Sequence, residues 1–244
     1  MTIAENLDRI VGAKEAIKGA IINKGVQVPS DAKIDEYHAF VEQIQGGGGG
    51  IDNNIVNLVI SGENPTYIDT IDLSALNFAT VGFAKLGSIQ DVVKIILPDT
   101  CKKLDTSAFA NNYSLTEIVM DGVQYMGYGI FAYTPISTFV LPDGLETCDT
   151  STFANSNAEY IVFPAGFLNG TYCLNESHKL RTIKFLGLKA PQFDDFDWAW
   201  SSVGDEVSGE HTIIVPVDGV GYDTDDFPPY KYLVNQKGWS FVRE

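Results

Sequence analysis

The stretch Val92-Val-Lys-Ile-Ile-Leu-Pro98 decides the fold of this chain, because four close copies of it follow. The copies begin at Leu115, Ile136, Ala158 and Leu180, which places the five starts 23, 21, 22 and 22 residues apart. Self-similarity with a period between about 20 and 50 residues is typical of solenoids. We therefore expect a stack of coils, each of which contributes one short strand and buries its apolar side against its neighbours.

A second landmark keeps the same period. Phe109, Phe131 and Phe153 lie 22 residues apart, and each is followed by an alanine. We expect these three rings to stack as a ladder on the wall opposite the strands, with Cys173 or Leu174 taking the place of a ring in the next coil. A proline ends three of the strands, because proline cannot donate a hydrogen bond to a ladder.

Alternation along each strand separates inward from outward side chains. Three inward columns are predicted: Val92, Leu115, Ile136, Ala158 and Leu180; Ile95, Ile118, Phe139, Ile161 and Ile183; Leu97, Met120, Leu141, Phe163 and Phe185. The outward column consists of Ile96, Val119, Val140, Val162 and Lys184. Four of its five members are apolar and β-branched, which suggests either a partner surface or a covering neighbour. Strand propensity alone favours the same residues, so both interpretations stay open.

The ends of the repeat region differ from its middle. A degenerate earlier copy begins at Ile71, and after Leu186 the repeat gives way to an acidic, aromatic stretch that contains Trp198 and Trp200. His211–Pro216 has the composition of a last strand. Because the terminal coils of a solenoid need an atypical cover, we expect a cap from about residue 187 onward.

Residues 1–45 have a helical pattern. A capping-box pair, Thr2 and Glu5, precedes an apolar stripe. The stripe consists of Ile3, Leu7, Ile10, Ile17 and Ile21. Helices this short need a partner, so either the stripe packs within an αα-hairpin or it anchors the chain in a multimer or on another protein.

Five consecutive glycines at 46–50 predict a flexible linker between this segment and the rest. The predicted organisation is therefore a helical anchor or oligomerisation segment at 1–45, a linker at 46–50 and a solenoid at 51–244. The fold class is mainly β, or α+β over the whole chain, with a right-handed, leucine-rich-repeat-like solenoid of about 5–6 coils behind an N-terminal helical hairpin.

The units resemble the BspA-like (Treponema-type) leucine-rich repeats. Ile-Leu-Pro-Asp at 96–99, Val-Leu-Pro-Asp at 140–143 and the Phe-Ala pairs carry this resemblance. The segment from Ala13 to Val26 is similar to the leaders of bacteriophage tail-fibre and other virion appendage proteins. The first resemblance implies adhesion in gut and oral bacteria, and it implies that phages of those bacteria borrow the repeats.

Charge and cysteine content limit the possible partners. The chain has 32 acidic and 16 basic residues and a formal net charge of −16, which disfavours nucleic acid and anionic membranes. Cys101, Cys148 and Cys173 form no ligand motif, so we expect buried small hydrophobes rather than disulfides or zinc. No export signal or membrane span is apparent, so we expect neither secretion by a signal peptide nor membrane insertion.

No catalytic motif and no paired-carboxylate constellation appears in the sequence, so we expect a protein without enzymatic activity or cofactor. The acidic runs at 194–197 and 223–226 lack the complete pattern of a calcium loop. The candidate partner surface is Ile96, Val119, Val140 and Val162, together with Trp198 and Trp200. These two tryptophans, with Tyr125, Tyr128 and Tyr133, suit either sugar stacking or the filling of the solenoid and its cap.

The function that this reading favours is a bacteriophage virion appendage, similar to a tail or head fibre. Such a protein is assembled in the host cytoplasm and released by lysis, and it needs no export signal. Its expected partners are other copies or virion proteins through residues 1–45, and a bacterial surface glycan or protein through the solenoid. The alternative is a bacterial adhesin or scaffold of the same fold, in the cytoplasm or at the cell surface.

Overall fold

The computed structural model describes Lys18 and residues 27–29, 70–82 and 92–244. The chain divides into two units, Met1–Asp52 and Asn53–Glu244, of which the second holds nearly all described residues. The predicted anchor stripe and the glycine linker lie outside the described residues. Among the residues that are described, no helix has the length and apolar character required to cross a bilayer.

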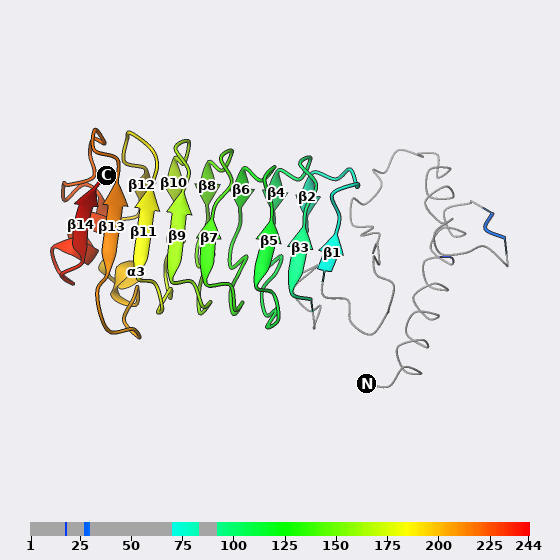
Figure 1. The fold of residues 1–244 in the computed structure, drawn as a ribbon, viewed down its shortest axis with the longest axis horizontal. Helices are drawn as coiled ribbons and strands as arrows, with labels where there is room; N and C mark the ends of the chain where they lie inside the picture. Colours follow the sequence, from blue (N-terminus) through cyan, green and yellow to red (C-terminus); the bar gives the residue numbers. More distant parts are fainter. Residues whose placement is uncertain (1–17, 19–26, 30–69, 83–91) are drawn as a thin grey trace. The chain divides into compact units, whose positions relative to one another are not determined.

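Residues 70–82 and 92–244 form a parallel β-solenoid, and the model is mainly β, as the repeat predicts (Figure 1). One wall, the long-strand row, consists of β1 (Thr70–Asp72), β3 (Lys94–Ile96), β5 (Glu117–Val119), β7 (Thr138–Val140), β9 (Tyr160–Phe163), β11 (Thr182–Phe185), β13 (Thr212–Val215) and β14 (Ser240–Arg243). A second wall, the short-strand row, consists of β2 (Thr80–Val81), β4 (Lys103–Leu104), β6 (Tyr125–Met126), β8 (Thr147–Cys148), β10 (Asn169–Gly170) and β12 (Gln192–Phe193).

Every described strand pair is parallel, because each coil adds a strand in the same direction as the one before it. The short-strand row is one continuous six-stranded sheet in the order β12-β10-β8-β6-β4-β2. The long-strand row is not continuous: β1-β3-β5 form one sheet and β14-β13-β11-β9-β7 form another. The repeat thus holds throughout, but one wall is interrupted.

The core between the walls is built from the predicted columns. All members of the three inward columns are buried except Ile118, which is partly buried and packs against the core. Phe109 and Phe131 stack with centroids 5.6 Å apart, and Phe131 and Phe153 stack at 6.1 Å. Cys173 and Leu174 are both buried in the next coil. The predicted phenylalanine ladder is therefore confirmed.

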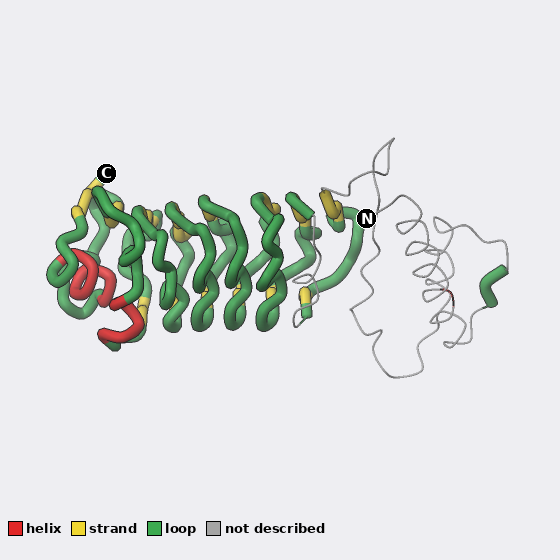
Figure 2. Tube along the Cα trace, turned by 90° about the horizontal axis from the view of Figure 1, so that it is seen from below, coloured by secondary structure: helices red, strands yellow, loops and turns green. Residues whose placement is uncertain are grey.

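The return arcs that carry the rings stack in regular order (Figure 2). Each arc turns twice through the left-handed backbone region, at Ser107, Gly129 and Ser151 and again four residues later at Asn111, Tyr133 and Asn155. Glycine and asparagine adopt this conformation at low cost, whereas Tyr133, with a φ of 61°, is an unfavourable residue for it. The coil geometry therefore overrides the local preference of Tyr133.

The cap contains one strand beyond those that the repeat predicts. The strand predicted at 211–216 is present as β13, but it is not the last one, because β14 pairs with β13 and extends the sheet by one strand. Helix α3 (Asp197–Ser201) and the π-helix η2 (Pro229–Val234) lie between the last strands in the sequence. Tyr222 is fully buried and donates its hydroxyl to the Gly187 and Lys189 carbonyls at 2.9 and 3.0 Å. Its burial raises its pKa to about 12.

Replacement of the middle ring of the ladder tests this packing. We expect Phe131→Ala to lower the free energy of unfolding by about 3–5 kcal/mol, because the ring is fully buried between two stacked rings and also contacts Phe139 at 4.9 Å. Chemical denaturation followed by circular dichroism measures the change. Tyr128→Ala, on an exposed ring of the same coil, is the control and should change the value by about 0.5 kcal/mol or less.

Candidate partner-binding surface

The outward column of the long-strand row is the first candidate surface. Cα registers align Asp72, Ile96 and Val119 in one sheet, and Val140, Val162, Lys184, Ile214 and Val242 in the other. Ile214 and Val242 extend the column beyond the residues that the sequence analysis named. The Thr-Ile-Ile-Val-Pro run at 212–216 has the same pattern as Lys94–Pro98, so the repeat signal was present for Ile214.

The column is interrupted between Val119 and Val140, which the sequence analysis treated as neighbours in register. Two local features coincide with the interruption. The arc before β5 has one residue more than the arcs before β7 and β9: Phe109 precedes Leu115 by six residues, whereas Phe131 precedes Ile136 by five. In addition, Pro135 occupies the same arc position as Asn157 of the next coil, 22 residues later. The N–H of Asn157 donates to the Thr134 carbonyl of the preceding coil at 3.0 Å. Proline has no N–H to donate, so the corresponding bond to the previous coil cannot form.

The exposure of the column varies from coil to coil. Val140 is 69% exposed, because its own sheet supplies a neighbouring strand on one side only. Val162 is 7% exposed between Val140 and Lys184, which corrects its place in the predicted partner surface. Ile96 and Val119 are half-buried. The apolar surface that is available to a partner is therefore centred on Val140 and the interruption beside it.

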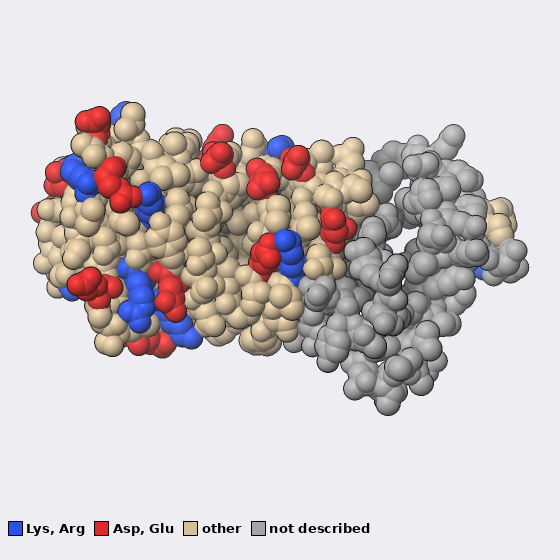
Figure 3. Space-filling model, viewed as in Figure 1, with Lys and Arg blue, Asp and Glu red and all other residues tan. Residues whose placement is uncertain are grey.

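Charges on this wall are partly neutralised in pairs. Lys94 pairs with Glu117, and Lys184 pairs with Glu244. The hydrogen bond from Glu244 raises the pKa of Lys184. Figure 3, drawn from the same side as Figure 1, shows acidic and basic residues side by side in several groups, with uncharged surface between the groups.

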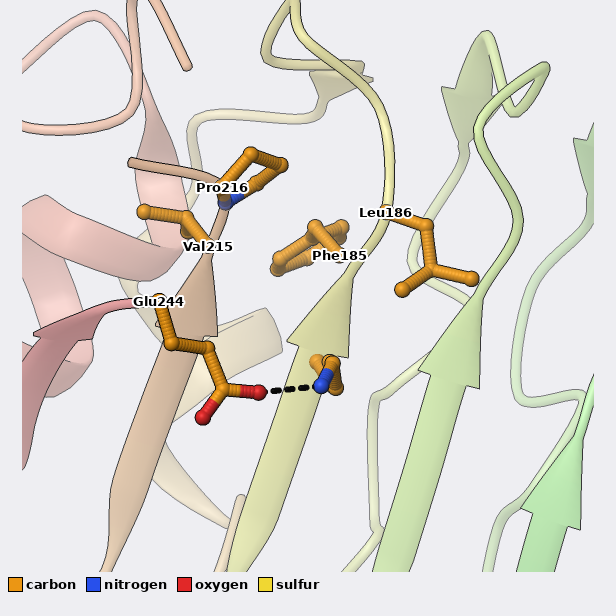
Figure 4. A pocket seen from close by; sticks show the side chains of 6 residues that line it. Phe185, Leu186, Val215, Pro216 and Glu244 are labelled. Carbon is orange, nitrogen blue, oxygen red and sulfur yellow. Dashed lines mark hydrogen bonds and ion pairs between the residues drawn. The ribbon is translucent and has the colours of Figure 1, made fainter. Parts of the chain in front are cut away.

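A depression of about 330 Å³ lies beside the second ion pair, at the ends of β11 and β13. Its lining is mainly apolar and includes Phe185, Leu186, Val215 and Pro216, and Glu244 stands at one side of it (Figure 4). A dashed line in the figure marks the ion pair of Glu244. The charged residues of its lining are Lys184 and Glu244, which pair with each other.

The two tryptophans have different environments. Trp200 is 3% exposed and packs in the cap against Phe193 and Tyr232, and its indole N–H donates to the Asp194 carbonyl at 3.1 Å. Trp200 therefore belongs to the core of the cap, and its assignment to the predicted partner surface is wrong. Trp198 is 54% exposed and lies 4.9 Å from the Tyr172 ring. Of the pair, only Trp198 offers a ring to a ligand.

Other exposed aromatic rings are spread along the solenoid. Tyr113, Tyr128 and Tyr133 are exposed on the return arcs, and Phe196 is exposed beside Tyr172, 6.0 Å away. Tyr125 is partly buried, and its hydroxyl lies 3.4 Å from the Asp149 carboxylate. Trp198, Tyr172 and Phe196 form an aromatic cluster.

Two members of the acidic runs form ion pairs within the solenoid and its cap. Asp195 pairs with Lys231 at 2.8 Å, a contact that lowers the pKa of Asp195, and Asp223 pairs with Arg243 at 3.0 Å. Within the described residues, no group of three or more acidic, histidine or cysteine side chains is placed to hold a metal ion. The cysteines are free and buried, as predicted.

An aspartate placed at Val140 or at Val162, two neighbouring positions of the outward column, tests which of them is exposed. We expect Val140→Asp to lower the free energy of unfolding by about 1 kcal/mol or less, which is the cost of strand propensity alone. We expect Val162→Asp to lower it by about 3 kcal/mol or more, because the carboxylate is buried without a partner. Denaturant unfolding of both variants measures the difference. Equal losses would mean that Val140 is covered in solution.

The comparison with known proteins agrees with this geometry. Residues 66–190, half of the chain, match six copies of the BspA type leucine rich repeat region. No curated protein matches the chain. The matched region contains β1 to β11 and the whole phenylalanine ladder. The repeat, its parallel coils and this match together show that the chain belongs to the BspA-type leucine-rich-repeat family.

Proposed function

We propose that this chain is a non-catalytic attachment protein that works as a bacteriophage virion appendage, similar to a tail or head fibre. The observation that carries the proposal is the apolar outward column, in which Val140 is 69% exposed beside the interruption of the long-strand row. Exposed apolar surface on an ordered scaffold marks interaction sites. Leucine-rich-repeat solenoids bind other proteins through such extended walls rather than through deep cavities.

The predicted front segment supports the virion role. Residues 1–45 have the apolar stripe of an anchor or multimer helix, and the glycines at 46–50 have the composition of a flexible tether. In this role the anchor joins other virion proteins, and the solenoid contacts a bacterial surface protein or glycan. Many copies on one particle turn weak contacts into firm attachment through avidity.

A bacterial adhesin or scaffold is the second candidate. Family membership favours it equally, because the same repeats and the same outward column suit a protein on a bacterial cell. Its genomic neighbourhood distinguishes the two: capsid and tail genes beside it support the virion role, whereas an isolated bacterial locus supports the adhesin.

Binding to cells tests the attachment role. We expect the fluorescently labelled full chain to bind intact cells of some members of a panel of gut and oral bacteria, as measured by flow cytometry. We expect Val140→Asp to weaken this binding about tenfold or more, as the loss of a central apolar contact does. Leu168→Asp, an equivalent change at an exposed leucine beside the short-strand row, is the matched control. Equal binding by both variants would exclude the outward column as the contact.

The size of the purified protein tests the anchor role. We expect mass photometry of the full chain to show a multimer, and we expect the double variant Ile10→Asp, Ile17→Asp to be monomeric, because both positions lie on the predicted stripe. Circular dichroism should show that the solenoid of the variant is unchanged. A monomeric full chain, both alone and with its particle proteins, would contradict the anchor role.

A further inference from the structure

The long-strand row has a gap in its hydrogen bonding between β5 and β7. On either side of this point the ladder is complete: Leu97 donates its N–H to the Val119 carbonyl at 2.9 Å, and Leu141 donates to the Val162 carbonyl at 3.1 Å. No backbone bond joins the described residues of β5 to those of β7. Figure 1 shows these two strands farther apart than the other neighbours in the row.

The gap is confined to one wall. Beneath it, β4, β6 and β8 pair without interruption, and Asp149 donates its N–H to the Met126 carbonyl at 2.8 Å. The rings of Phe109, Phe131 and Phe153 also stack without interruption. The two parts of the long-strand row are therefore held at a fixed separation by the walls behind them.

The backbone groups that border the gap point into it. In a parallel strand, the N–H and C=O of one residue face one side, and those of the next residue face the other. Since Val119 accepts a bond from the β3 side, Ile118 faces β7. Since Leu141 donates to β9, Thr138 and Val140 face β5. Two strand edges thus face each other, and unpaired edges of this kind are templates for another strand.

The side chains at the gap agree with this geometry. Ile118 is the partly exposed member of its inward column, whereas Ile95, Ile161 and Ile183 are fully buried. On the opposite side, Phe139 is fixed by contacts with Phe131 and Phe153 at 4.9 and 4.8 Å, so its ring does not swing across to cover Ile118. The core of the solenoid is therefore incompletely closed at this coil.

We propose that one extended strand of a partner protein docks between β5 and β7 and completes the long-strand row. The proposal rests on the function proposed above and names the form of the partner. A strand supplies the backbone donors and acceptors that both edges lack, an interaction known as β-augmentation. A glycan has no regular backbone ladder and does not satisfy these edges.

The walls of the gap specify the docked sequence. The outward residue of the docked strand that lies beside Glu117 and Thr138 is favoured as basic, because Glu117 pairs with Lys94 on one side and its carboxylate is still exposed toward a second cation. The next residue points inward between Ile118 and Phe139 and is favoured as apolar. The third points outward between Val119 and Val140 and is also favoured as apolar. The partner segment is therefore basic-apolar-apolar and parallel to β5.

The chain itself contains a strand that meets these requirements. In β3, Lys94-Ile95-Ile96 pairs in parallel with β5, and Lys94 forms an ion pair with Glu117. A synthetic peptide with the sequence of residues 92–98 is therefore the probe of choice. The same peptide N-methylated at the positions of Ile95 and Ile96 keeps the side chains but lacks two backbone donors, and it is the matched control.

Hydrogen exchange of the full chain tests the free gap and the docked state together. Without peptide, we expect the amides of Ile118, Thr138 and Val140 to exchange at least tenfold faster than those of Ile161 and Ile183, whose ladder is complete. We expect the probe peptide to slow these three amides, and the N-methylated peptide to leave them unchanged. Equally slow amides in the free chain would overturn the proposal, and so would peptide protection confined to the free edge of β14.

A backbone variant gives an independent readout. Val140→Pro removes one N–H that faces the gap and keeps the bonds from β7 to β9, which Phe139 and Leu141 make. We expect at least tenfold weaker peptide binding by fluorescence anisotropy, with the β9 amides as well protected as before. Unchanged binding would overturn the proposal. If the peptide fails but Val140→Asp still abolishes cell binding, the attachment role stands and only strand docking is excluded.

Discussion

The stack of Phe109, Phe131 and Phe153 is the interaction on which the rest of the solenoid depends. Each ring fills the space between the two walls of its coil, and a spacing of 22 residues brings the next ring above it. The stack therefore fixes both the width of the coil and its register with its neighbours. Strand pairing follows from that register, because successive coils then present their backbones at the spacing of a parallel sheet.

The same dependence explains why one wall can be interrupted without the loss of the fold. The added residue before β5 and Pro135 before β7 change only the arcs that lead into the long-strand row. The rings and the short-strand row continue past them, so the coils stay aligned while two strands separate. An irregularity in the repeat is thus converted into a local feature of the surface, next to the most exposed apolar residue of the outward column.

The sequence was sufficient for the periodic features and insufficient for the exceptions. The inward columns, the ladder and the buried cysteines follow from alternation and period alone, and the structure confirms them. The exposed fractions of the outward side chains could not be predicted from the sequence, because Val140 and Val162 are the same residue type at the same position of their repeats. Their difference depends on whether the neighbouring coil pairs, which periodicity does not report. Trp198 and Trp200 show the same limit, since the turn of a five-residue helix buries one and exposes the other.

Strand β14 was missed for a related reason. Ser240–Arg243 lacks the apolar run and the terminal proline that mark the other strands, and it is recruited by its position beside β13. The anchor stripe and the glycine linker remain predictions, since they fall outside the described residues. They connect the solenoid to the proposed virion role, whereas the family membership and the coil geometry do not depend on them.

Contact between nearest coils has a consequence for how such proteins change over evolution. Each coil touches only the one before it and the one after it, so a duplication of 22 residues adds one complete layer with ready-made neighbours. Such a duplication moves the far end outward by about 4.8 Å and leaves the cap intact. The reach of the protein is therefore adjustable in fixed increments, with no redesign of either end.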